Sequence, residues 1–158
     1  MIEMSLIKDE THYEKKQLDV MEEIFTQNFI TSESAEPETH LNPATPEIRI
    51  HIRLTQGVLP ELLFRALGED LYDLIGNKDF LNAFIHPRSQ ETPSLVFSFV
   101  GDFRSFDFKI TSKDEKNLAE GSQKMIEKLL SELNREELPP QSKDAYSFHY
   151  EKGDWIEA

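Results

Sequence analysis

The stretch EIRIHIRLT, residues 47–55, is the clearest secondary-structure signal in the chain. Ile48, Ile50 and Ile52 alternate with polar residues, among which Arg49 and Arg53 carry positive charge. A period of two residues predicts a β-strand that buries one face and leaves the other face polar. This strand therefore defines a core face and an open face for the sheet to which it belongs.

The elements that follow this strand alternate between helical and extended patterns. Leucines at three- and four-residue spacing predict a helix over residues 58–75 that stops at Gly76-Asn77, and a second short helix follows over 79–85. The remaining patterns predict strands over 94–100 and 103–111 around a Gly101-Asp102 turn, a helix to about residue 134, and a last strand at Tyr146, Phe148 and Tyr150.

This succession, βαββαβ, predicts a ferredoxin-like α+β antiparallel sandwich. Because parallel crossovers are almost always right-handed, we expect the four strands in the order 4-1-3-2, with both helices on one face. The predicted organisation has three parts. They are an N-terminal amphipathic helix within residues 1–30, a flexible acidic and proline-rich linker over 31–46, and the ferredoxin-like domain over 47–158.

The chain is acidic and has no cysteine. It contains 30 Asp and Glu against 17 Lys and Arg, which gives a formal net charge of −13 at pH 7. Such a charge favours basic protein partners and disfavours nucleic acid and anionic membranes.

The lack of cysteine excludes disulfides and thiolate metal sites. With neither a signal peptide nor an apolar run of about 18 residues, we expect a soluble, cytoplasmic protein.

The polar face of the predicted sheet carries the candidate ligand-binding residues. They come from the first and third strands, which the predicted order makes neighbours: Arg49, His51, Arg53, Asp107 and Lys109. This strip suits a small anion or an acidic peptide, but its cations could equally pair with Asp107 and Glu47. RNA-recognition domains stack bases on aromatic residues of this face, and the first strand here has none.

No residue pattern in the chain has the spacing of a catalytic, cofactor or metal site. The five histidines show no metal-ligand spacing, and the common glycine-rich and nucleophile motifs are absent. Glu69, Asp70 and Asp73 form a carboxylate cluster that we interpret as a solvated helix face. We therefore expect no catalytic residue, no cofactor and no metal, although the sequence does not decide whether the chain is an enzyme.

The segment Gln56-Gly57-Val58 resembles part of the phosphate-binding loop of acylphosphatases. Those enzymes share the predicted fold and carry Q-G-V-x-F-R at this place, where the loop and its arginine hold a phosphate. Here Pro60 and Glu61 occupy the aromatic and arginine positions, and we interpret the three-residue match as chance. The resemblance nevertheless implies a phosphate- or anion-binding enzyme or sensor as an alternative function.

The strand over residues 94–100 is predicted to be an edge of the sheet. It reads SLVFSFV, without charge or proline, and a bare edge of this kind pairs readily with another chain. Leu95, Phe97 and Phe99 are the candidate interface residues, covered by the N-terminal helix or by a second copy in a homodimer.

The predicted function is a non-catalytic, acidic protein-interaction module. An adaptor, inhibitor or immunity-type protein that binds a basic partner accounts for both the charge and the missing catalytic motifs. The alternatives are the anion-binding enzyme or sensor described above, and a nucleic-acid binder that uses the open sheet face.

Overall fold

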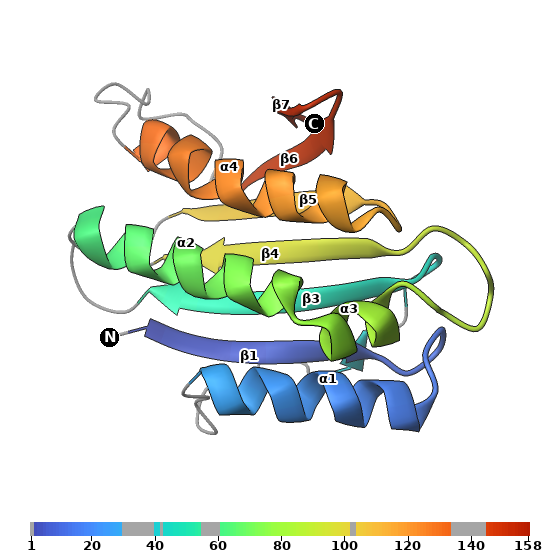
Figure 1. The fold of residues 1–158 in the computed structure, drawn as a ribbon. Helices are drawn as coiled ribbons and strands as arrows, with labels where there is room; N and C mark the ends of the chain where they lie inside the picture. The colour runs from blue at the N-terminus through green and yellow to red at the C-terminus, as the bar shows by residue number, and fades with distance from the viewer. Residues whose placement is uncertain (1, 30–39, 42, 55–60, 102–103, 134–144) are drawn as a thin grey trace.

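The computed structural model describes residues 2–29, 40–41, 43–54, 61–101, 104–133 and 145–158 (Figure 1). Its elements follow in the order β1 (Ile2–Asp9), α1 (Lys15–Asn28), β2 (His40–Leu41), β3 (Glu47–Leu54), α2 (Glu61–Gly76), α3 (Lys78–Phe84), β4 (Ser94–Val100), β5 (Ser105–Thr111), α4 (Glu115–Leu133), β6 (Ala145–Glu151) and β7 (Asp154–Glu157). Most of the linker predicted over 31–46, and the Gln56-Gly57-Val58 segment, lie outside the described residues.

The strands form one mixed, seven-stranded sheet in the order β2-β1-β3-β4-β5-β6-β7. Three neighbouring pairs are parallel (β1–β2, β3–β4 and β5–β6) and three are antiparallel (β1–β3, β4–β5 and β6–β7). The described helices all lie on the same side of this sheet (Figure 1). The fold therefore has two layers, a helical layer and a sheet whose other face carries no described helix.

The predicted ferredoxin-like order 4-1-3-2 is wrong, because each crossover joins neighbouring strands. β3 and β4 are adjacent and parallel, and so are β5 and β6. The crossover from β3 to β4 and the crossover from β5 to β6 each move the chain by one strand in the same direction across the sheet. The strands β3 and β4, however, run antiparallel to β5 and β6. Since α2 and α4 pack together on one face, the two crossovers must have opposite hands. The β3–β4 crossover is right-handed and the β5–α4–β6 crossover is left-handed, which is an exception to the usual rule.

The predicted N-terminal helix is present, but it is shorter than residues 1–30 and a strand precedes it. Residues Ile2–Asp9 form the strand β1, and the helix α1 is confined to Lys15–Asn28. β1 pairs along most of its length with β3, and its residues Met4 and Leu6 are buried on the helix side. The N-terminal residues thus belong to the same sheet and the same hydrophobic core as the rest of the described chain.

The hydrophobic core lies between the sheet and the helical layer. Ile48, Ile50 and Ile52 are fully buried, so the predicted alternation is confirmed over residues 47–53, where burial is described. The neighbouring strands continue this apolar face with Leu95, Phe97 and Phe99 from β4, Phe106, Phe108 and Ile110 from β5, and Tyr146, Phe148 and Tyr150 from β6. Side chains of one parity from four adjacent strands therefore form one continuous surface beneath the helices.

β4 is a central strand rather than the predicted edge. It is hydrogen-bonded to β3 on one side and to β5 on the other. Leu95, Phe97 and Phe99 are completely buried, so they are core residues and not an accessible surface. The lack of charge in this strand reflects burial on both faces, because Val96 and Ser98 on the opposite face are also buried.

Two glycines allow the helices to approach their neighbours closely. A Cβ at Gly68 in α2 would lie 2.5 Å from Cγ1 of Ile126 in α4. A Cβ at Gly121 in α4 would lie 2.8 Å from Cδ1 of Ile110 in β5. Gly68 therefore permits the contact between α2 and α4, and Gly121 permits α4 to lie directly on the sheet.

Candidate functional site

The five candidate ligand-binding residues all lie on the open face of the sheet. Arg49, His51 and Arg53 alternate along β3 with the buried isoleucines, and Asp107 and Lys109 alternate along β5 with buried phenylalanines and an isoleucine. β4 separates these strands, so the two groups are not on neighbouring strands as the predicted order required. Any contact between them must cross β4.

The small side chains of β4 allow the two charged groups to meet. In the strand register Arg49 pairs with Val96, and Asp107 pairs with Ser98. Nη1 of Arg49 donates to Oδ2 of Asp107 at 3.4 Å, so this ion pair runs diagonally over β4. Val96 and Ser98 lie beside this pair in the strand register and are only 2% and 4% exposed, although no described helix covers this face.

Two further contacts hold this charged cluster in place. Nη2 of Arg49 donates to Oε2 of Glu47 at 3.4 Å, and the Ser98 hydroxyl donates to Oδ1 of Asp107. Arg49 therefore pairs with both Glu47 and Asp107, which is the alternative role for the cations of this strip. Nε of Arg49 is buried and has no hydrogen-bond partner among the described residues.

The histidines on this face do not form a pair. Burial lowers the pKa of His51 below its ordinary value of 6.5, and the positive charges of Arg49 and Arg53 lower it further against the opposing effect of Asp107. His51 is therefore neutral near pH 7. His149 lies on β6, and two strands separate it from β3; its Nε2 is 2.9 Å from Oε2 of Glu151.

A small hollow of about 160 Å³ opens on the sheet face beside this cluster. Residues of the four adjacent strands β3, β4, β5 and β6 line it. Its charged and polar side chains come from Glu47, Arg49, Asp107, Lys109, Ser147 and His149. The sequence identified the charged residues of β3 and β5 but not the contribution of β6, because the predicted order placed the last strand beside the first.

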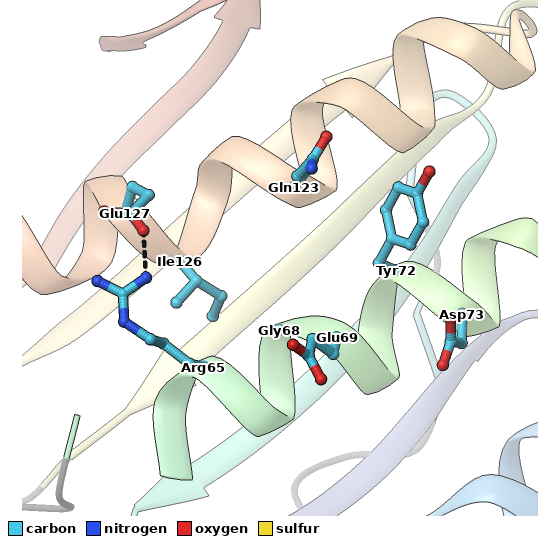
Figure 2. A pocket seen from close by; sticks show the side chains of 8 residues that line it. All are labelled: Arg65, Gly68, Glu69, Tyr72, Asp73, Gln123, Ile126 and Glu127. Atoms are coloured by element: carbon cyan, nitrogen blue, oxygen red, sulfur yellow. Dashed lines mark hydrogen bonds and ion pairs between the residues drawn. The ribbon is translucent and has the colours of Figure 1, made fainter. Parts of the chain in front are cut away.

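A larger hollow of about 420 Å³ lies on the opposite side of the molecule, between α2 and α4 (Figure 2). Figure 2 shows Tyr72 pointing from α2 toward α4, and Ile126 pointing from α4 toward Gly68. The lining residues are Arg65, Gly68, Glu69, Tyr72, Asp73, Gln123, Ile126 and Glu127. We call this hollow the α2–α4 groove.

The α2–α4 groove combines an exposed aromatic ring with acidic side chains. Tyr72 is 42% exposed, and among the described large hydrophobic residues only Ile156 is equally exposed. Glu69 and Asp73 lie one turn apart on the exposed side of α2, and Glu127 on α4 forms an ion pair with Arg65. The three carboxylates and one guanidinium of the lining give a net charge of −2 (1 − 3). The sequence indicated a solvated helix face for this cluster and gave no sign of the groove, which depends on the packing of two helices.

A buried aspartate joins the first strand to the first helix, and the sequence did not reveal it. Asp9 is fully buried and accepts hydrogen bonds from the backbone N–H groups of Thr11, His12 and Glu47. Its Oδ2 is also 2.8 Å from Nδ1 of His12. A carboxylate that orients an imidazole occurs in catalytic sites. Here the backbone contacts join the end of β1, the turn that follows it and the start of β3, so we assign this pair a structural role.

The adjacent Tyr13 reinforces this junction. Its hydroxyl donates to the carbonyl oxygen of Phe84 at 2.6 Å and thereby ties the start of α1 to the end of α3. Burial, and to a lesser degree the charge of Asp9, raises the pKa of Tyr13 far above its ordinary value. Tyr13 is therefore a neutral donor in the core and does not take part in proton transfer near neutral pH.

Neither a metal site nor a membrane span is found in the described part of the chain. Its His, Asp and Glu side chains form no group of three or more that could hold a metal ion. Its helices are too short or too polar to cross a membrane.

No protein-family model, curated protein or solved structure matches the chain significantly. A function must therefore be inferred from the geometry and charge of the molecule.

Proposed function

We propose that the protein is a non-catalytic interaction module that binds a basic segment of a partner protein in the α2–α4 groove. The observation that carries this proposal is the presence of Tyr72 and three carboxylates around one hollow. Protein interfaces are commonly anchored by an aromatic residue within a polar rim. Tyr72 would supply the anchor, and Glu69 and Asp73 would supply the acidic rim.

The charges favour a basic partner over other ligands. Arg65 in the groove is held by Glu127, whereas Glu69 and Asp73 form no ion pair with a described residue. A Lys or Arg side chain of a partner would therefore meet carboxylates rather than a competing cation. The net charge of −13 would add long-range attraction, which raises association rates more than affinity.

Fluorescence anisotropy with a labelled nona-lysine peptide would test this proposal. The double variant Glu69→Lys/Asp73→Lys should weaken binding at least about tenfold, equivalent to about 1.4 kcal/mol. The control double variant Glu91→Lys/Glu157→Lys changes two exposed carboxylates outside the groove. Both variants change the net charge from −13 to −9 (−13 + 4), so general attraction is matched between them.

The comparison of the two double variants decides the question. We expect the control to retain most of its affinity and Tyr72→Ala to lose about 1 kcal/mol of binding free energy. An equal loss in both double variants would show that the peptide responds to overall charge. That result would contradict a binding site in the α2–α4 groove.

A further inference from the structure

The small hollow on the open sheet face is separate from the α2–α4 groove, because the sheet lies between them. Arg49 from β3 and Lys109 from β5 lie on either side of Val96, which pairs with both in the strand register. Ser147, Phe148 and His149 of β6 line it as well, together with Ala158. The hollow thus brings together donors from three strands.

Arg49 is held in position but its hydrogen-bonding capacity is underused. Both of its ion-pair contacts are 3.4 Å long, whereas good N–H···O hydrogen bonds measure about 2.7–3.2 Å. Its Nε is buried without a partner among the described residues. A guanidinium has five N–H donors in a rigid plane, so most of its capacity remains for a better-placed acceptor.

Lys109 provides a second positive charge at the same hollow. It is exposed, and it forms no ion pair with a described residue. Asp107, by contrast, also accepts a hydrogen bond from Ser98, so it keeps a donor if Arg49 turns toward another acceptor. Lys109 and the unused N–H groups of Arg49 are therefore available to an added acceptor, while Asp107 stays hydrogen-bonded.

We propose that this hollow binds a small monocarboxylate between Arg49 and Lys109. The planar fork of a guanidinium matches the two oxygens of a carboxylate and can donate to both. Glu47 and Asp107 balance the charges of Arg49 and Lys109, so a ligand with one negative charge meets less repulsion than a phosphate dianion. The volume of about 160 Å³ restricts the ligand to a small molecule.

Titration of the full chain with acetate, followed by ¹H–¹⁵N NMR at constant ionic strength, tests this site. Acetate should produce saturable shifts at the amides of Val96, Ser147 and His149, and chloride should not. Arg49→Lys keeps the charge but loses the planar fork, and it should weaken acetate binding at least about tenfold. Lys109→Gln should weaken it as well, and this exposed substitution leaves the fold intact.

Arg53→Gln is the matched control, because Arg53 lies on the same strand and face but does not line the hollow. It should bind acetate as the wild type does. Linear shifts that equal those with chloride would overturn the proposal. So would unchanged affinity in both Arg49→Lys and Lys109→Gln, and tighter binding of phosphate than of acetate would overturn the assignment to a monocarboxylate.

Discussion

The two faces of β3 show how differently one strand can be used. On the helix side Ile48, Ile50 and Ile52 are completely buried in the core. On the open side Arg49 makes two long ion pairs, and Arg53 is exposed. The isoleucine side chains lose no hydrogen bonds to water on burial, because they have no polar group. The arginine side chains remain partly solvated. The isoleucines therefore belong to the core, whereas the charged side chains of the open face remain partly exposed.

The largest expected effect on stability comes from placing a charged side chain on the buried face of β3. Ile50→Asp places a carboxylate in a fully apolar environment and should reduce the free energy of unfolding by more than about 4 kcal/mol. Arg53→Ala on the open face should change it by no more than about 0.5 kcal/mol. Urea unfolding monitored by circular dichroism measures both. A folded Ile50→Asp variant with the stability of Arg53→Ala would contradict the difference between the faces.

This difference was predictable from sequence, because it depends on neighbouring residues alone. The alternation of Ile48, Ile50 and Ile52 with charged residues indicates the buried face of β3 without knowledge of the other strands. The predicted helices likewise correspond to α2, α3 and α4, since their apolar spacing is local. β1 was missed, although Met4 and Leu6 alternate with Glu3 and Ser5, because Ile7 interrupts the pattern.

The strand order was not predictable in the same way. The predicted and observed orders use the same helices, and both place the same side chains of β3, β4, β5 and β6 beneath them. They differ in the place of β5 and in the hand of the β5–α4–β6 crossover. The predicted order inserts β5 between β3 and β4, whereas β3 and β4 are adjacent and β5 pairs on the outer side of β4. No side-chain pattern records either feature. The order 4-1-3-2 requires each crossover to pass over one strand, and it is wrong because both crossovers join adjacent strands, the second with a left hand.

The alternation of side chains along each strand predicts which residues of the candidate site share a face, but not which of them are neighbours. Arg49, His51, Arg53, Asp107 and Lys109 share a face because their parity places them there. The ion pair across β4 and the lining from β6 depend on which strands are neighbours. The α2–α4 groove depends on helix packing, so sequence showed its carboxylates but not the hollow between them.

The next prediction tests how tightly the helical layer packs on the apolar face. In Gly121→Ala the new methyl group would lie 2.8 Å from Cδ1 of Ile110 and 3.2 Å from the Tyr150 ring. Because both neighbours are buried, the variant should lose about 1–3 kcal/mol of stability. Thermal and urea unfolding provide the measurement.

Gly76→Ala is the control for this substitution. A Cβ at Gly76, the last residue of α2, meets no atom within 4 Å. The variant should be as stable as the wild type or more stable by up to about 1 kcal/mol, because alanine favours the helix more than glycine does. If both alanine variants had equal stability, the close packing of α4 on the sheet would be contradicted.

The smallest expected effect belongs to the open face and concerns pH. The pKa of His51 is lower in the folded protein than its ordinary value of 6.5, so the folded state binds fewer protons than the unfolded state as pH falls through this range. The stability associated with neutral His51 is therefore present above pH 6.5 and is lost as the pH falls toward the lowered pKa. Between pH 7.5 and 5.5 the wild type should lose more free energy of unfolding than His51→Gln. The two proteins differ only at residue 51, so the difference between them isolates the contribution of His51.

Salt separates the two causes of this pH dependence. Burial is the larger cause of the lowered pKa, and the charges of Arg49 and Arg53 are the smaller one. Salt screens interactions between partly exposed charges but does not restore the hydration that burial removes. Most of the difference between wild type and His51→Gln should therefore persist in 0.5 M sodium chloride. Its disappearance at high salt would show that the arginines, rather than burial beside β4, keep His51 neutral.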